Sequence, residues 1–230
     1  MITVKRFRRI EQAVRQAGFG DIIDWSETIA APPNADAFAT ESIYVICNSG
    51  MRVTVAEPIY RRCLEALANG ASATTVFGQP GKGPAIDEIW ARRHELFAGF
   101  QAADDKAAFC ETIPWIGPVT KYHLAKNFGV DVAKPDVHMK RLAEVERTTP
   151  EKMCKRLARQ VGYRVATVDS ILWRACAEGI LSSSRYVVDG WRRAFSGRPN
   201  HRFLIEYEAL ERELTPTDTK PGQRVIPGQE

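Results

Sequence analysis

The residues best suited to chemistry lie in a short central stretch. Ile113-Pro-Trp-Ile-Gly-Pro118 is a hairpin bounded by proline and glycine, and Asp136 follows it at the start of a basic segment. Such a hairpin between two helices can direct backbone N–H groups at one phosphate, assisted by the partial positive charge of the next helix N-terminus. A fixed carboxylate can stabilise developing positive charge and orient a water molecule. Together the two features indicate an anion-binding element beside a carboxylate.

The spacing of these features predicts how they are brought together. Asp136 lies 17 positions after Val119. This interval fits a helix from Val119 to Phe128, a left-handed turn at Gly129 and a return loop that ends near the start of that helix. A second helix is predicted from Asp136 to Glu146, entered through Pro135. Asp136 therefore has an ordinary alternative role as an N-cap, and the hairpin could be an ordinary helical corner.

Helical patterns cover most of the remaining chain, and no segment reads as a convincing sheet, so the predicted class is all-α. A loop is expected at 31–35 and a glycine-rich turn at 78–84. Residues 1–214 are expected to form one domain, with a disordered tail at 215–230 that is rich in proline, glycine and polar residues. The other predicted helices are 4–17, 41–67 with a break near Asn48-Ser49-Gly50, 85–100, 104–112, 148–160 opened by a capping box at Thr148–Glu151, and 167–178.

Composition sets broad limits on function. The chain has 230 residues, 44% of them hydrophobic and 26% charged, which suits one large domain or two lobes that share a cleft. No apolar run is long enough for a membrane span, and no apolar signal core follows the basic start, so a cytoplasmic protein is expected. No CxxC pair exists, so buried free thiols are expected and not a thiolate zinc site. The five cysteines are Cys47, Cys63, Cys110, Cys154 and Cys176.

The net charge of +4 permits nucleic-acid binding without arguing for it. Its distribution is more informative, because cations gather after the hairpin. Such a cluster is either a solvated helix face or, beside a nucleic-acid motif, a phosphate-binding surface. The cluster comprises Lys134, Lys140, Arg141, Arg147, Lys152, Lys155, Arg156, Arg159 and Arg164.

The central segment resembles the helix-hairpin-helix superfamily of base-excision DNA glycosylases, which includes endonuclease III and 8-oxoguanine glycosylase. The matching residues are the hairpin Ile113-Pro-x-Ile-Gly-Pro-x-Thr120 and Pro135-Asp-Val-His-Met-Lys-Arg-Leu142. Weaker likeness extends to Ile43–Arg52 and to Gly81–Ile86. The resemblance implies a two-lobed all-α fold with a cleft between the lobes, a monomer, and double-stranded DNA with a modified base as the partner, in a cytoplasmic, nucleoid-associated setting.

The resemblance also assigns roles to residues. Asp136 is expected to support cleavage of the N-glycosidic bond after the base has been flipped out of the duplex. The backbone carbonyls of Glu111, Ile113 and Ile116 are expected to hold a monovalent cation; no other cofactor is expected. The expected DNA contacts are Gly117, Val119, Thr120, His138, Lys140, Arg141, Met51, Arg52 and Lys82. For His138, a plain helix-surface position is the alternative.

The sequence departs from the family at two positions of the hairpin. Bifunctional members carry a nucleophilic lysine where this chain has Val119, so a monofunctional, water-using enzyme is expected. Lys121 is the first alternative nucleophile, although it lies roughly 200° around the helix; Lys106 and Lys82 are further alternatives. Trp115 occupies a position where the family usually has glycine. The iron–sulfur cluster of many relatives is not expected, because only two cysteines follow the hairpin.

The base that the enzyme would recognise is predicted from a late helical segment. Asp169 and Trp173 are four positions apart and share a helix face, and His123 falls on the hairpin helix. By resemblance to the 8-oxoguanine branch, these residues would read and stack on a guanine-type base. Core packing of Trp173, and an ordinary helix charge at Asp169, are the alternatives. Tyr44, Trp115 and Tyr122 are further aromatics that could line a pocket or pack in a core.

The leading interpretation is therefore a DNA N-glycosylase for a modified purine such as 8-oxoguanine. A glycosylase for alkylated purines or mismatched pyrimidines, a non-catalytic DNA-binding module, and a structural all-α protein are the alternatives.

Overall fold

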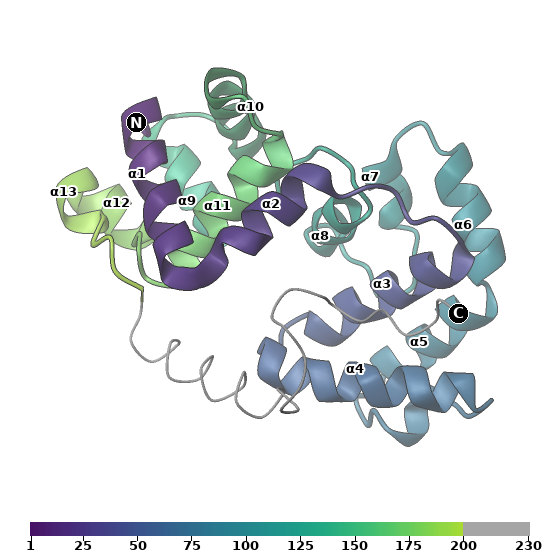
Figure 1. The fold of residues 1–230 in the computed structure, drawn as a ribbon. Coiled ribbons are helices and arrows are strands. Elements are labelled where there is room, and N and C mark those ends of the chain that lie inside the picture. The colour runs from purple at the N-terminus through teal and green to yellow at the C-terminus, as the bar shows by residue number, and fades with distance from the viewer. Residues whose placement is uncertain (200–230) are drawn as a thin grey trace.

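A computed structural model describes residues 1–199, and these form an all-helical structure (Figure 1). Within this range the only pairing of extended backbone is an isolated bridge between Leu181 and Phe195. The tail expected to be disordered lies outside the described residues. The elements are α1 (Val4–Val14), η1 (Arg15–Phe19), α2 (Gly20–Thr28), α3 (Ala35–Asn48), α4 (Val53–Ala68), η2 (Ala73–Thr75), α5 (Lys82–Ala91), α6 (Arg93–Ala102), α7 (Lys106–Cys110), α8 (Thr120–Asn127), α9 (Val137–Val145), α10 (Pro150–Val161), α11 (Val165–Ala177), α12 (Ser183–Asp189) and α13 (Trp191–Ala194).

Buried apolar side chains gather into two clusters, and each belongs to its own set of helices. The terminal group consists of α1, η1, α2 and α9 to α13, and its core includes Phe7, Leu157 and Ile171. The central group consists of α3 to α8, and its core includes Phe38 and Phe128. Figure 1 shows the two groups side by side. The central group is therefore inserted between two parts of the chain that pack together.

The chain crosses between the groups twice, and the two crossings touch. Gly129 has a φ of +77°, and a Cβ there would lie 2.8 Å from the carbonyl carbon of Ala30. Glycine is thus required by its backbone conformation and by this close approach, and the predicted left-handed residue is confirmed. Arg164 joins both crossings, since its guanidinium donates to the carbonyl oxygens of Ile29 at 3.2 Å and Gly129 at 2.5 Å.

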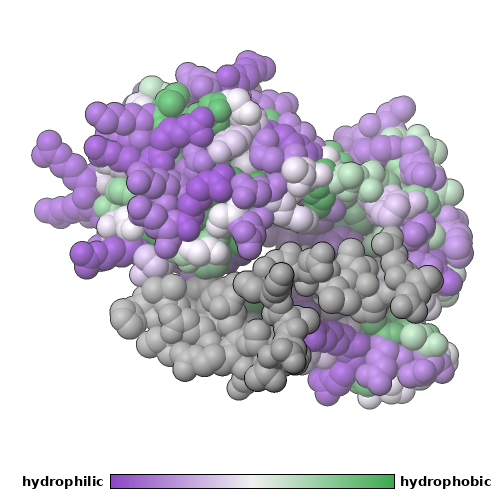
Figure 2. Space-filling model, in the orientation of Figure 1, coloured by the Kyte–Doolittle hydropathy of each residue, from purple (hydrophilic) through white to green (hydrophobic). Residues whose placement is uncertain are grey.

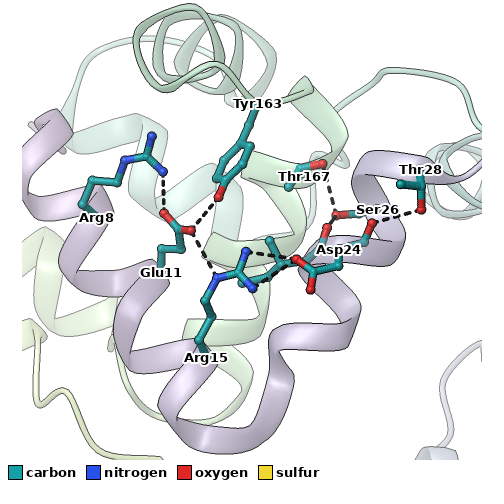
Figure 3. Close-up of polar contacts among 9 residues, drawn as sticks. Arg8, Glu11, Arg15, Asp24, Ser26, Thr28, Tyr163 and Thr167 are labelled. Carbon is teal, nitrogen blue, oxygen red and sulfur yellow. Dashed lines mark hydrogen bonds and ion pairs between the residues drawn. The ribbon is translucent and has the colours of Figure 1, made fainter. Parts of the chain in front are cut away.

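The terminal group is organised around α11, which contacts α1, α2, α9 and α10. On α1, Glu11 accepts hydrogen bonds from Arg8, Arg15 and the Tyr163 hydroxyl (Figure 3). Burial would raise the pKa of Glu11, but these hydrogen bonds lower it below its ordinary value. Glu11 therefore helps to fasten α1 to the turn before α11.

Several predicted helix boundaries need correction. The break between α3 and α4 is confirmed, but the expected helix at 85–100 is two helices, α5 and α6, which meet at Arg92. The expected capping box at Thr148 is also wrong. Thr149 is the N-cap of α10 and accepts the N–H of Lys152, with Pro150 as the first helical residue. Proline suits that position because its missing N–H would have no partner within the helix.

Two expectations from composition can be compared with the structure. All five cysteines are buried and free, as expected. Among residues 1–199, no helix is both long enough and apolar enough to cross a bilayer.

Candidate active site

Asp136 lies at the junction of the two helical groups, at the start of α9. It is the N-cap of this helix, and its Oδ1 accepts the N–H of Met139 at 3.0 Å. This bond satisfies one of the free N–H groups of the first turn and fixes the side chain. Oδ2 accepts no hydrogen bond from a described residue. Asp136 therefore fulfils the capping role and still has one carboxylate oxygen available.

The loop that carries Asp136 is attached to α11. Asp131 accepts the N–H of Ala166 at 2.9 Å, and the N–H of Lys134 donates to Asp169 Oδ1 at 3.0 Å. The N–H of Asp136 then donates to the Lys134 carbonyl at 2.9 Å. These bonds lead step by step from α11 to Asp136. The position of the carboxylate thus depends on α11.

Asp169 is part of a buried ion pair that links the two groups. Its side chain is 1% exposed and bonds to the ammonium group of Lys126 on α8. Burial raises the pKa of Asp169, and the Lys126 ammonium and the Lys134 N–H counteract that rise. Both carboxylate oxygens are occupied. The structure therefore does not present Asp169 as an open contact for a base, the role expected from the sequence.

Lys126 and Lys134 lie beside Asp136 and Asp169. Neither lysine was singled out from the sequence as a site residue. Lys134 is half-buried, and its ammonium makes no hydrogen bond or ion pair with any residue from 1 to 199. Burial lowers its pKa, and the Lys126 charge lowers it further, whereas Asp136 and Asp169 raise it. The sequence Lys134-Pro-Asp136 could have drawn attention to Lys134.

His123 on α8 faces the same lysines. Burial, with added repulsion from the Lys134 and Lys126 ammonium groups, lowers the pKa of His123 to about 3. The imidazole is therefore neutral near pH 7 and able both to donate and to accept a hydrogen bond. We refer to Lys126, Lys134, Asp136, Asp169 and His123 together as the junction site.

The hairpin between α7 and α8 contains a residue in the left-handed conformation, Trp115. Trp115 has a φ of +66°, a conformation in which glycine carries no penalty. The Trp115 ring lies against Gly81, where an added Cβ would meet it at 2.0 Å. The N–H groups of Gly117, Val119 and Thr120 donate to no described residue. The hairpin thus offers free donors at the start of α8.

The backbone carbonyls expected to hold a monovalent cation belong to Glu111, Ile113 and Ile116. The Ile113 carbonyl accepts the N–H of Ile116 at 3.0 Å. The cation at these carbonyls stays a prediction, and no step of the chemistry is assigned to it. Among residues 1–199 no group of three or more His, Cys, Asp or Glu side chains could hold a metal ion.

The lysines considered as alternative nucleophiles are all engaged elsewhere. Lys121 bonds to Glu111 at 2.5 Å, and this hydrogen bond raises its pKa. Lys106 donates to the carbonyl oxygens of Phe100 and Gln101. Lys82 is 5% exposed and donates to the Ser49 carbonyl at 2.6 Å. Lys82 is also poorly placed for the DNA contact expected of it, because its ammonium is inside the central group.

The other expected DNA contacts lie on several elements. Lys140 is exposed and Arg141 half-buried on α9, and His138 Nδ1 bonds to the Ser183 hydroxyl at 2.9 Å. Arg52 is exposed at the start of α4. Met51 packs against the central core. Lys140 and Arg52 are thus surface cations on different helical groups.

The expected pocket aromatics are mainly involved in packing. Trp173 packs against the core of the terminal group, and the Arg174 guanidinium lies 5.0 Å from its ring centroid. Tyr44 packs edge-on against Tyr60 with ring centroids 5.4 Å apart. Tyr122 lies beneath the Lys121 ammonium. Trp115 is the exception, since it is 47% exposed.

Comparisons with protein-family models, with curated proteins and with solved structures gave no match to this chain.

Proposed function

We propose that this chain is a helix-hairpin-helix DNA N-glycosylase in which Asp136 supports cleavage of the bond between base and sugar. The proposal rests on one observation: Asp136 is held where two helical groups meet, after a hairpin, and residues 1–199 leave one of its oxygens and three hairpin N–H groups without a hydrogen-bond partner. In this proposal the terminal and central groups are the two lobes, and DNA binds between them.

Each part of the arrangement has a role in the proposed reaction. The N–H groups of Gly117, Val119 and Thr120 bind a phosphate at the start of α8. A flipped nucleotide then places its sugar beside Asp136. Positive charge grows on the sugar as the bond to the base breaks, and the carboxylate stabilises that charge and orients a water molecule. His123, which is neutral, can hydrogen-bond the base or the water.

The substrate in this proposal is a damaged or modified base in double-stranded DNA. A purine was expected because Asp169 would accept from a guanine edge. Since Asp169 is buried and paired with Lys126, that reason no longer applies. The proposal therefore names no particular base.

The test uses a panel of duplexes that each contain one modified base, scored for abasic sites. The wild-type chain is expected to excise at least one base. Asp136→Asn is expected to reduce that rate by about 10²–10³, the loss typical of one charge-stabilising group, while DNA binding persists. Asp105→Asn is the matched control, because Asp105 is also a capping aspartate, at the start of α7, and lies outside the junction site.

Two results would contradict the proposal. Equal activity of the Asp136→Asn and wild-type chains would remove Asp136 from the reaction. DNA binding without excision of any base in the panel would favour the non-catalytic binding module.

A further inference from the structure

Two depressions in the described part of the molecule have cations in their lining, and both lie away from the junction site. One has a volume of about 380 Å³ on α10 and is lined by Lys152, Lys155, Arg156, Arg159 and Gln160. The other, of about 520 Å³, is lined by Met1, Thr3, Lys5, Arg6, Arg9 and Trp191. Neither α1 nor α10 carries a residue of the junction site.

The two depressions lie on neighbouring helices. Helices α1 and α10 are in contact, and a hydrogen bond joins the lining of the first depression to the first residues of the chain. Arg156 donates to the Ile2 carbonyl at 3.0 Å, while the neighbouring Met1 and Thr3 line the second depression. We call this surface the α1–α10 basic face. Figure 2 shows that hydrophilic residues cover most of the visible surface of the terminal group.

Acidic side chains neutralise only some of the cations of this face, among them Arg156, which pairs with Glu146 at 2.7 Å. Glu11, the only acid of α1, is 8% exposed and already bonded to Arg8, Arg15 and Tyr163 (Figure 3). Glu151, the only acid of α10, bonds to Lys155. Four exposed cations form no ion pair with a described residue: Lys5, Arg9, Lys152 and Arg159. An ordinary solvated helix face mixes both signs of charge, whereas this one presents mainly positive charge.

We propose that the α1–α10 basic face is a second nucleic-acid surface that binds the phosphate backbone. On α10, Lys152 and Arg159 are seven positions apart, so they span about 10 Å of one helix side. This distance corresponds to about three phosphates at 3.4 Å of axial rise for each strand. Arginine dominates the α1 side of the face, and its planar guanidinium suits phosphate.

The composition of α10 argues against a lipid surface as the partner of this helix. Helices that lie on membranes insert apolar side chains beside their cations. On α10 every exposed residue is polar, and the apolar residues Met153, Leu157 and Ala158 are buried in the core. The helix therefore has charge for a polyanion and no exposed apolar side for insertion.

The test measures binding of an unmodified 30-base-pair duplex across a salt series by fluorescence anisotropy. The variant is Arg9→Gln/Lys152→Gln/Arg159→Gln. If each cation contacts one phosphate, the slope of log K against log salt falls by about 0.9 per contact, or about 2.7 in total. The control for net charge is Arg61→Gln/Arg62→Gln/Arg92→Gln, which removes three exposed cations from the central group, two of them paired with acidic neighbours.

The control variant is expected to keep the wild-type slope, and both variants are expected to keep the wild-type thermal unfolding midpoint. Equal loss of slope in the two variants would overturn the inference, since net charge alone would explain it. An unchanged slope in the α1–α10 variant would also overturn the inference. So would a variant that no longer binds phosphatidylserine vesicles or polyglutamate but binds DNA as well as the wild-type chain does. The readout needs no excision, so its outcome is independent of whether Asp136 is catalytic.

Discussion

Replacing Asp169 by asparagine is expected to destabilise the fold strongly. The change leaves the ammonium of Lys126, whose side chain is 13% exposed, without its buried partner, while the amide oxygen can still accept the N–H of Lys134. Removing one member of a buried pair typically costs about 3–5 kcal/mol, because the remaining charge is uncompensated. The free energy of unfolding, measured by urea denaturation at pH 7, is expected to fall by that amount.

Lys126→Met and the double variant complete a thermodynamic cycle. Lys126→Met alone leaves a buried carboxylate and is also expected to be destabilising. The double variant removes both charges, so its loss is expected to be smaller than the sum of the two single losses. A loss below about 1 kcal/mol in Asp169→Asn would show that the pair does not hold the two groups together.

The same variant distinguishes the structural role of Asp169 from base recognition. If Asp169 only holds α8 and the Lys134 loop, Asp169→Asn is expected to leave the order of preference among the modified duplexes unchanged. A changed order of preference in Asp169→Asn, measured at a temperature at which the variant is folded, would identify Asp169 as the residue that reads the base.

Three further predictions concern particular residues. His123 is expected to stay neutral at pH 5 and to take up a proton only near pH 3, as followed by NMR of the imidazole; protonation near pH 6.5 would refute its placement beside two ammonium groups. Trp115→Gly is expected to be about 1 kcal/mol more stable than Trp115→Ala in urea denaturation, because both lack the ring and only alanine is strained at a φ of +66°; equal stability would contradict the left-handed turn. The pKa of Glu11 is lower in the folded chain than its ordinary value. The ionised Glu11 therefore stabilises the fold above that ordinary pKa, and this stabilisation is lost as the pH falls through the folded-state pKa. Glu11→Gln is therefore expected to be about 1–3 kcal/mol less stable than wild type at pH 7, with a difference that shrinks below pH 4.5; a constant difference from pH 3 to 7 would be inconsistent with this cause.

The sequence predicted the all-α class and the local features that depend on nearby residues. Gly129 was identifiable because glycine after an apolar helix end favours a left-handed cap. The break between α5 and α6 was missed because Arg92, where they meet, is neither glycine nor proline and fits a helix equally well. Local signals such as these fix single turns but do not fix how turns pack.

The parts of the junction site that were missed depend on contacts between distant residues. Asp169 and Trp173 do share a helix, but spacing along α11 could not reveal that Lys126 comes from α8 to meet Asp169. Lys134 was read as one cation of a basic cluster, although its surroundings set it apart from the exposed cations of α10. Burial and pairing across the two groups decide these roles, and neither is a local property.

The contact between Gly129 and Ala30 has a consequence for the order of folding. The ends of the central group are already adjacent, so that group can form its core from one continuous stretch of chain. The terminal group must instead bring α1 and α2 against α9 and α11 across roughly a hundred intervening residues, which carries a loop-closure entropy that grows with the logarithm of the loop length. Once the central group has folded, Ala30 and Gly129 are already adjacent, so the entropy of closing the long loop no longer has to be lost. We therefore expect the central group to fold first, and the helices on either side of it in the sequence to pack together afterwards.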